Sequence, residues 1–544
     1  TYMEEREAFW KAIEKLVRDS NIVIDRPKGT AHPRFPDFIY KIDYGYLENT
    51  SSMDQGGIDV WVGTDSRKQI DAIMCIVDLM KRDSEIKILI GCTEEEKERE
   101  FNTMKSKQIT TEDKFNNKWG FVISCIGSSV GMANIWLFPY RAGEFGGAAF
   151  LIPYIIFVVL IGFTGVIGEM AFGRAMQSGP LGAFKKAYEM KGSKLGTFIG
   201  LIPVIGSLGI AIGYSVIIGW ILKFFADSIT GKIISEEDPS AIFGELSRDF
   251  GSIPWHLLGL FLVLLCMSFG VARGIEKVNR IMMPAFFVLF LFLAVRVAFL
   301  DGSAPGYSYL FKPDWSEMAN PRTWVYAMGQ AFFSLSLAGS GTVVYGSYLK
   351  SDVDVVSSAK YVAFFDTAAA LLAGLVIIPA VFSFGMAPNS GPGLLFITIP
   401  AVIRDIPLGR VFAIIFFLAV LFAGITSLMN LLESPVEALQ KRLGWSRRSA
   451  ITFIGVITAA VGIFVEGGLL SAWMDSISIY VIPLGALLAG ITMFWICGDK
   501  FARNAAQLGR VRTIGKWFKP MTKYVFCGVA VLVYILGIFF GGIG

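Results

Sequence analysis

The chain has 544 residues, of which 54% are hydrophobic and 17% charged. A soluble protein of this length would form about three or four domains and carry about a quarter charged residues, so a soluble multidomain enzyme and a disordered chain are both excluded. The net charge of +4, two histidines and six scattered cysteines also argue against a nucleic-acid binder, a catalytic histidine, a zinc site and a disulfide scaffold. The composition predicts a polytopic membrane protein.

The first 108 residues differ from the rest because their composition is that of a soluble segment. A charged, amphipathic stretch from Glu4 to Arg18 predicts a helix. A charged tail over 93–101 predicts a further helix or a linker. Runs rich in β-branched and aromatic residues predict strands at 21–25, 38–46, 58–63 and 85–90. We therefore expect a small α+β, β-barrel-like domain over residues 1–108 and a membrane domain over 109–544.

Beyond residue 118, apolar stretches of about 20 residues recur, the length of a helix that crosses a hydrocarbon core of about 30 Å. We expect eleven such spans: 119–143, 147–173, 196–225, 255–272, 275–299, 322–348, 355–386, 408–438, 449–466, 474–496 and 521–542. Basic residues gather in the loops after the second, fourth, eighth and tenth spans. The positive-inside rule therefore places these loops and the N-terminus in the cytoplasm of a cell membrane, with the C-terminus outside because the number of spans is odd.

Two of the expected spans are interrupted near their middles by small residues and glycines, at 127–134 and 334–341. Close packing between helices explains either run taken alone. The two runs lie in the first and sixth spans, which occupy matching places in a five-plus-five inverted repeat, and such pairs mark transport sites made of unwound half-helices. Carbonyl groups freed there can bind cations, and the N-terminus of a half-helix can hold a carboxylate.

Five longer motifs are informative because they occur in a fixed order. They are GSSVGMANIWLFPY at 127–140, GGAAFLIPY at 146–154, EMAFGR at 169–174, GQAFFSLSL at 329–337 and FAGITS at 422–427. They resemble the motifs of the neurotransmitter:sodium symporter family, and the resemblance covers about residues 115–544. It implies the LeuT-type fold, a 5+5 inverted repeat with 11 transmembrane helices as in many bacterial members. It also implies a sodium-coupled amino-acid symporter rather than an enzyme.

The resemblance implies two sodium ions held by hard oxygen ligands at matching positions. The first site would use the Ser129 carbonyl, Asn134, Ser334, Asp366 and the carboxylate of the substrate. The second site would use the carbonyls of Gly127, Val130 and Ala423 and the hydroxyls of Thr426 and Ser427. Taken alone, these two hydroxyls would be expected to bond back to their own helix.

The resemblance also implies a site for the amino acid. Its residues would be Ser129, Met132, Ala133, Ile210, Tyr214, Phe333, Ser334, Ser336 and Leu431. No charged side chain faces the expected side-chain pocket, so a neutral, apolar amino acid is favoured, because an unpaired charge would be costly there. Gly339 stands where relatives often have a larger side chain, and its small size favours a bulky or aromatic substrate.

Asp366 is an ionisable residue within the seventh span, which makes it a candidate functional group. Chloride-dependent relatives have an asparagine at the matching position and a serine one turn later, where this chain has Ala370. A fixed carboxylate could replace chloride in balancing the sodium charge. We therefore expect chloride-independent transport, with Asp366 as the chloride-substituting carboxylate.

Other positions depart from the pattern of the family. Leu137, Asn116 and Lys441 replace charged residues that form gate pairs in relatives. Their loss leaves open a transporter-like receptor in which amino-acid binding regulates the N-terminal domain. Gly274 and Pro284 form a pair at the start of the fifth span that, in similar bacterial members, lets the helix unwind near the second sodium ion. An ordinary helix start with a kink is the alternative.

The N-terminal segment resembles a second family. The motifs IVIDRPKGTAHP at 22–33, DYGY at 43–46 and DQGGID at 54–59 are similar to parts of family I soluble inorganic pyrophosphatases. This resemblance implies a Mg²⁺ and phosphate site at Arg26, Tyr44, Asp54 and Asp59. Gly56 replaces one aspartate of the motif and the segment is short, so we expect an inactive binding or regulatory module, with a membrane-anchored pyrophosphatase as the alternative. The expected partners are an amino acid as small-molecule substrate and the lipid bilayer, and no nucleic acid.

Overall fold

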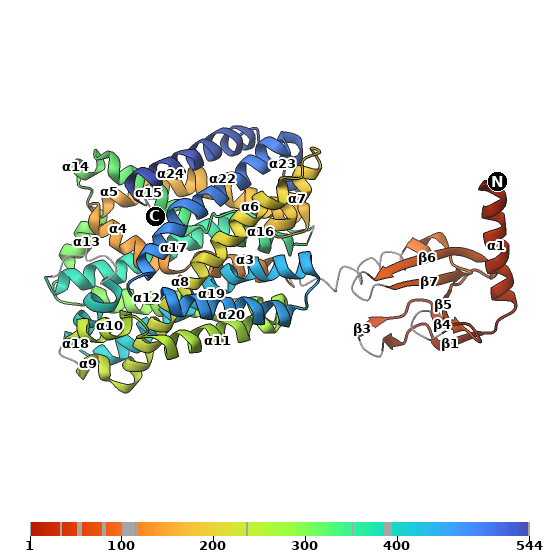
Figure 1. Ribbon diagram of the computed structural model, residues 1–544, viewed down its shortest axis with the longest axis horizontal. Coiled ribbons are helices and arrows are strands. Elements are labelled where there is room, and N and C mark those ends of the chain that lie inside the picture. Colours follow the sequence, from red (N-terminus) through yellow and green to blue (C-terminus); the bar gives the residue numbers. More distant parts are fainter. Residues whose placement is uncertain are drawn as a thin grey trace. The chain divides into compact units, whose positions relative to one another are not determined.

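A computed structural model describes residues 2–32, 35–51, 57–78, 83–98, 100, 115, 117–235, 238–350, 352–385 and 394–541 (Figure 1). The chain divides into two compact units, Thr1–Glu112 and Asp113–Gly544. The division lies four residues beyond the expected boundary at residue 108. Each unit has its own hydrophobic core.

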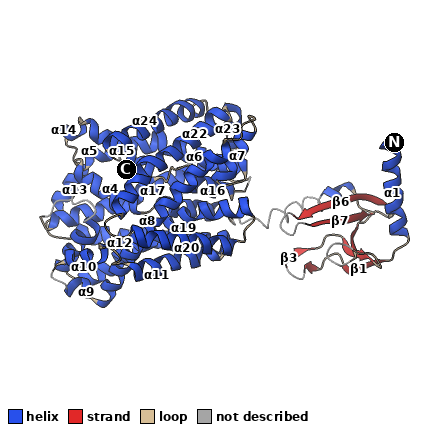
Figure 2. Ribbon diagram, viewed as in Figure 1, coloured by secondary structure: helices blue, strands red, loops and turns tan. Residues whose placement is uncertain are grey.

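The first unit combines one long helix with β-strands (Figure 2). Its elements are α1 (Tyr2–Arg18), β1 (Ile22–Arg26), β2 (Ala31–His32), β3 (Phe35–Ile39), β4 (Asp43–Leu47), β5 (Ile58–Val62), β6 (Ile70–Asp78) and β7 (Asp83–Ile90). Among the described strands, five form a sheet in the order β1-β4-β5-β7-β6, and β2 pairs with β3. Only β5 and β7 run parallel within the larger sheet.

The two faces of this sheet carry different cores, because successive side chains of a strand point to opposite sides. On one face, Val60 and Ile88 pack with Leu16 of the amphipathic helix α1. On the other face, Trp61 of β5 packs against Tyr44 of β4 in a cluster of aromatic residues. This second face carries Tyr44 and Asp59, two of the residues expected to form the phosphate site.

The sequence predictions for this unit held only in part. The helix and three of the strands form close to the expected residues, but the run 38–46 is divided between β3 and β4, and β6 was not expected. The described sheet ends in two edge strands, β1 and β6, and is therefore open where we expected a barrel-like closure.

The second unit is helical throughout its described residues, with several short π-helical turns inside longer helices (Figure 2). Its first half contains α3 (Lys118–Ser129), α4 (Phe138–Glu144), α5 (Ala148–Phe157), α6 (Phe163–Met176), α7 (Pro180–Glu189), α8 (Gly196–Thr230), α9 (Lys232–Ser235), α10 (Pro239–Ser247), α11 (Ile253–Ser268) and α12 (Lys277–Ala298). The rest contains α13 (Ala304–Phe311), α14 (Trp315–Met318), α15 (Pro321–Ser334), α16 (Gly341–Ser347), α17 (Val355–Ser383), α18 (Ile399–Asp405), α19 (Gly409–Leu443), α20 (Arg447–Val465), α21 (Leu470–Ser476), α22 (Ile482–Ile491), α23 (Asp499–Gln507) and α24 (Cys527–Phe540).

Eight helical segments of the described chain are long and apolar enough to cross a membrane. They are 148–176, 196–230, 274–298, 355–383, 409–443, 447–465, 470–496 and 520–540. The bent pair α3 and α4 makes a ninth. The two remaining expected spans are α11, which has 16 residues, and the interrupted pair α15 and α16. The unit is therefore a multi-pass membrane domain, and the expected number of eleven spans is not established by helix length and composition.

The first interrupted span is broken after Ser129. The next residue, Val130, has a φ of −70° and a ψ of 106°, which are extended rather than helical. The chain resumes a helical path at Ala133 with a bend of 51°. The interruption expected at 127–134 is thus present as a real break of the helix.

The second interrupted span is broken between α15 and α16. Within the break, Ser336 and Gly339 both have positive φ angles, of 53° and 66°. A side chain at Gly339 would place its Cβ atom 2.4 Å from the carbonyl oxygen of Gly485 on α22. The break therefore depends on a glycine at position 339 for both its backbone conformation and its close approach to α22.

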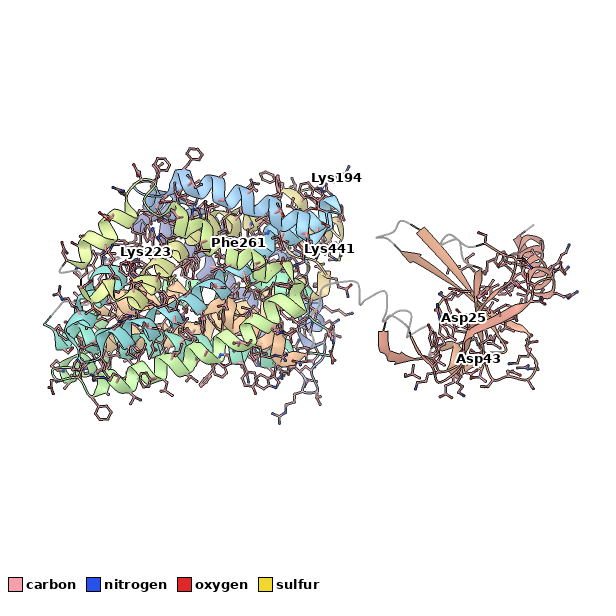
Figure 3. All side chains as sticks on the ribbon, turned by 90° about the horizontal axis from the view of Figure 1, so that it is seen from below. Asp25, Asp43, Lys194, Lys223, Phe261 and Lys441 are labelled. Carbon is pink, nitrogen blue, oxygen red and sulfur yellow. The ribbon has the colours of Figure 1, made fainter. Side chains whose placement is uncertain are left out.

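The helices of the membrane unit are arranged with short segments at both ends (Figure 1). The helices α9, α10, α13, α14 and α18 lie at one end, and α7 and α23 lie at the other. Lys194 and Lys441 lie together at one end, with Lys223 towards the opposite end (Figure 3). The exposed Phe261 lies between the two ends on the outside of the unit, as expected for a surface that faces lipid.

We expect Gly339→Ala to lower the melting temperature of the purified protein in detergent by several degrees. The added Cβ atom would clash with the backbone of α22, and the alanine would have to hold a positive φ. Together these effects should lower the free energy of unfolding by about 2–4 kcal/mol. Gly444→Ala is the matched control, because Gly444 has a φ of 67° but no atom within 4 Å of its Cβ position. An equal fall in melting temperature in the two variants would show that the contact with α22 does not contribute to stability.

Candidate functional site

The broken segment of the first span exposes main-chain oxygens because its amide groups bond elsewhere. In a continuous helix, the amides of Gly131 and Met132 would donate to the carbonyls of Gly127 and Ser128. Instead the Gly131 amide donates to the side-chain oxygen of Asn134 at 3.1 Å, and the Met132 amide donates to the Tyr214 hydroxyl at 3.1 Å. The carbonyl of Ser128 accepts hydrogen bonds from two other segments, the second break and α19. Its donors are the hydroxyls of Ser336 at 3.0 Å and Ser427 at 3.3 Å.

The side chains proposed for the first sodium site converge on Asp366. Asn134 donates from its amide nitrogen to Asp366 Oδ1 at 2.9 Å and to Ser334 Oγ at 3.0 Å. Ser334 donates to Asp366 Oδ2 at 2.5 Å, and Tyr154 lies 3.2 Å from the same serine hydroxyl. Asn134, Ser334 and Asp366 are all fully buried. None of the ion pairs in the described part of the chain involves Asp366, so neutral donors alone hold this carboxylate within the membrane unit.

Ser129 ends the first half of the broken span, and Gln330 lies on α15 one turn before Ser334. The Ser129 hydroxyl bonds back to the carbonyl oxygens of Cys125 and Ile126, at 3.1 and 3.2 Å, and so leaves the coordination of an ion to its main chain. Gln330 donates from its side-chain nitrogen to the carbonyl of Ala133 at 2.7 Å. Gln330 therefore ties the second broken span to the first, in addition to the contacts of Asn134 and Ser334.

The residues proposed for the second sodium site lie where α3 meets α19. The Cβ position of Gly127 is 3.1 Å from the Cβ atom of Thr426. The Thr426 hydroxyl donates within its own helix, to Phe422 and Ala423 at 3.0 Å each, as it would in the absence of an ion. Ser427 reaches across to the carbonyl of Ser128. Val130 follows directly at the break, so main-chain and hydroxyl oxygens from both helices are near one another.

The polar residues proposed to bind the amino acid surround the same break. Tyr214 contacts the Met132 amide, next to Ala133 at the start of the second half-helix. Ser336 extends from the second break. The apolar residues come from three helices, with Ile210 on α8, Phe333 on α15 and Leu431 on α19, and each is only half-buried. The Ser207 hydroxyl donates to the carbonyl of Leu431 at 2.8 Å, so α8 and α19 are in direct contact here.

Glu169 supports the second break from α6. Its carboxylate is buried and accepts a hydrogen bond from the Gly339 amide at 2.7 Å. Position 339 therefore lies between Glu169 and the backbone of α22. Our argument that the small Gly339 enlarges the substrate pocket is wrong for this reason: the space beside it is filled by Gly485, and a side chain would meet protein rather than a ligand.

The start of α12 is irregular at the expected position. A π-helical turn spans Val271–Glu276 and contains Gly274, and Pro284 lies inside the helix that follows. A side chain at Gly274 would place its Cβ atom 2.2 Å from the carbonyl of Cys266 on α11. This part of the fifth expected span is therefore wound differently from a standard α-helix.

A buried ion pair was not anticipated from the sequence. Arg447 and Glu433 form two parallel contacts of 2.8 Å, and Tyr348 donates to Glu433 at 2.8 Å. This cluster joins α19, α20 and the end of α16, and Glu433 lies on the same helix as Lys441. At the gate positions, Asn116 lies outside the described residues. Leu137 precedes α4, in which Arg141 pairs with Glu144 at 2.9 Å.

The N-terminal unit brings part of its expected phosphate site together. Arg26 donates to the Tyr40 hydroxyl at 3.1 Å, and its guanidinium carbon lies 5.1 Å from the centre of the Tyr44 ring. Asp59 bonds to the Tyr44 hydroxyl and to Lys87, whose burial in a strand we did not anticipate. Burial raises the pKa of the Tyr44 phenol above its ordinary value. Asp54 lies outside the described residues.

The expected Mg²⁺ site of this unit is not supported by the described side chains. Among the residues that the structure describes, no three or more acidic, histidine or cysteine side chains are grouped to hold a metal ion. The Asp59 carboxylate forms an ion pair with Lys87. The resemblance of this segment to pyrophosphatases therefore remains a prediction.

Comparison with known proteins gives matches over the membrane unit. The model of the family described as "Sodium:neurotransmitter symporter family" matches residues 112–237 and 242–540. The sodium-dependent transporter YhdH of Bacillus subtilis is 36% identical over 350 residues, covering 62% of this chain and 77% of that protein. A sodium-dependent transporter of Methanocaldococcus jannaschii is 31% identical over 440 residues, covering 76% of this chain and 88% of that protein.

A solved structure extends this likeness to three dimensions. The crystal structure of MhsT in complex with L-phenylalanine shares 33% sequence identity, with a TM-score of 0.72, and the match covers 78% of this chain and all of that one. The membrane unit therefore has the LeuT-like fold of a polytopic helical transporter, and the homologues are transporters, not enzymes. The chain belongs to the sodium:neurotransmitter symporter family and is a sodium-dependent membrane transporter.

Proposed function

We propose that this protein imports a neutral, hydrophobic or aromatic amino acid together with two sodium ions, by alternating access. The observation that carries the proposal is the convergence of two broken helices on the buried carboxylate of Asp366. A buried carboxylate held only by neutral donors is costly, and a cation or a proton would offset that cost. The solved relative MhsT was crystallised with L-phenylalanine, which supports a substrate of that class.

The first sodium ion would lie between the two breaks. Its ligands would be the Ser129 carbonyl, Asn134, Ser334, Asp366 and the carboxylate of the substrate. The closeness of Ser334 and Asn134 to Asp366 supports this assignment. Asn134 presents its amide nitrogen to Asp366 while its oxygen accepts from Gly131, so to bind the ion its side-chain amide would turn and present the oxygen. Hard oxygen ligands of this kind suit a small alkali cation.

The second sodium ion would join α3 to α19. It would take the carbonyls of Gly127, Val130 and Ala423 and the hydroxyls of Thr426 and Ser427. The diversion of the Gly131 amide to Asn134 supports this assignment, because it removes the donor that Gly127 would have in a continuous helix. An ion at this point would fix the position of the first broken span against α19.

The amino acid would complete the first sodium site. Its carboxylate would meet the amides of Met132 and Ala133 at the N-terminus of a half-helix, together with the Tyr214 hydroxyl. Its ammonium group would meet the carbonyls of Ser129, Phe333 and Ser334 and the hydroxyl of Ser336. Its side chain would lie among Ile210, Phe333 and Leu431, which are apolar and only half-buried. An uncharged side chain fits these surroundings.

Alternating access would use the breaks and the irregular start of α12. We propose eleven spans in a 5+5 inverted repeat, with the end that carries α7 and α23 in the cytoplasm and the C-terminus outside. The buried pair of Arg447 and Glu433 would then lie on the cytoplasmic side and close it in place of the missing gate residues.

Unwinding of α12 between Gly274 and Pro284 would let water reach the second ion. The N-terminal unit would be a cytoplasmic appendage.

Purified full-length protein in liposomes should accumulate radiolabelled L-phenylalanine when sodium is outside and potassium inside. We expect uptake several-fold above that measured with equal sodium on both sides, because the ion gradient supplies the driving force. Gramicidin, which collapses the gradient, should abolish the excess. Binding of phenylalanine without gradient-driven accumulation would indicate a receptor, and accumulation that is equal in sodium and potassium would exclude sodium coupling.

Asp366→Asn should convert chloride-independent uptake into uptake that is slow without chloride and faster with it. The variant keeps the shape of the side chain but removes the charge that would offset sodium, so we expect at least a tenfold loss in chloride-free buffer, about 1.4 kcal/mol. Glu144→Gln is the control, because it removes an acid from a peripheral pair with Arg141. Wild-type rates in the Asp366 variant with and without chloride would contradict the assignment.

A further inference from the structure

Asn279 is a buried polar residue near the second proposed ion site to which the sequence assigned no role. It lies in the first turn of α12, three residues beyond the π-helical turn, and its side chain is fully buried. Its amide nitrogen donates to the carbonyl of Ile275 at 2.8 Å, which fixes the orientation of the side-chain amide. The side-chain oxygen therefore points away from its own helix.

This oxygen has no hydrogen-bond partner among the described residues. A buried acceptor without a donor costs about as much as a lost hydrogen bond, and water inside a membrane domain is scarce. Natural proteins rarely leave such a group without a partner, which is often an ion or a water when it is not protein. The side-chain oxygen of Asn279 is thus available to a small ligand.

This oxygen lies beside Gly127, one of the residues proposed for the second ion site. A side chain at Gly127 would place its Cβ atom 1.8 Å from Asn279 Oδ1 and 3.1 Å from the Cβ atom of Thr426. The absence of a side chain at Gly127 therefore leaves room for the Asn279 oxygen. Gly127, Asn279 and Thr426 belong to α3, α12 and α19, and these three helices pack on one another.

We propose that Asn279 is a further residue of the second sodium site, and that its side-chain oxygen is an additional ligand of the cation. An amide oxygen is a hard, neutral ligand of the same kind as the main-chain carbonyls that would surround the ion. Its bond to Ile275 connects the ion to the π-helical turn of α12. Loosening of that turn would withdraw one ligand from the ion and so weaken its binding at the moment of release.

The inference rests on the proposed function, because it assumes that an ion binds between α3 and α19. It differs from that function in adding a third helix to the site. Asn430 offers a comparison: it is also buried, and its side-chain oxygen packs 1.8 Å from the Cβ position of Gly341 in the other broken span. Asn430 lies at the second break and not at the second ion site.

The test is equilibrium binding of radioactive sodium to the purified full-length protein, displaced by unlabelled sodium chloride. Asn279→Leu removes the oxygen at similar volume. We expect one of the two bound sodium ions to need about a tenfold higher sodium concentration for half-saturation than in the wild type. Asn279→Asp keeps the oxygen and adds a charge, so we expect tighter binding than in the wild type. Asn430→Leu alters an equally buried asparagine but should leave the half-saturating sodium concentration as in the wild type.

The outcomes separate the inference from the proposed function. Absence of sodium binding in the wild type would overturn the proposed function itself. Sodium binding by the wild type that is the same in Asn279→Leu would overturn the role of Asn279 alone. Should Asn279→Leu fail to fold, Asn279→Asp decides, because unchanged or weaker sodium binding in that variant would refute a direct contact between this side chain and the ion. A lower melting temperature with unchanged sodium binding would likewise refute it.

Discussion

The structure of the membrane unit depends on where two main-chain amides of the first span find their acceptors. The amides of Gly131 and Met132 bond to Asn134 and Tyr214 instead of to the preceding turn. Within a membrane domain each such exchange must be complete, since an amide without an acceptor costs several kcal/mol in the absence of water. The break is stable because side chains replace the lost helical bonds, and the same exchange leaves carbonyl oxygens for other ligands.

The second break depends on the first. Ser336 donates to the Ser128 carbonyl, and Ser334 reaches Asp366 together with Asn134. Glu169 holds the amide of Gly339 from the opposite side. The two breaks therefore form one polar core inside an apolar bundle, whose long helices α8 and α19 are the most buried. An ion and a zwitterion placed there would meet oxygen and nitrogen atoms that the fold has already brought together.

The sequence predicted what is determined by local pattern. The glycine runs at 127–134 and 334–341 located both breaks, and the apolar lengths located most of the membrane helices. It could not predict contacts between residues far apart in the chain, such as those of Glu433 with Arg447 or of Asn279 with Gly127. Gly339 illustrates the difference: its small size was visible in the sequence, but only the packing of α22 shows that this size serves the backbone and not a ligand. In the first unit, the division of 38–46 into two strands depended on pairing partners that local propensity does not specify.

The most direct test of the account is an experimental structure of the full-length protein in sodium with L-phenylalanine. The account predicts density for the amino acid between the two breaks, with one ion beside Asp366 and a second between Gly127 and Thr426. Helices that run unbroken through Ser129 and Leu337, or breaks with no ion beside them at saturating sodium, would contradict it.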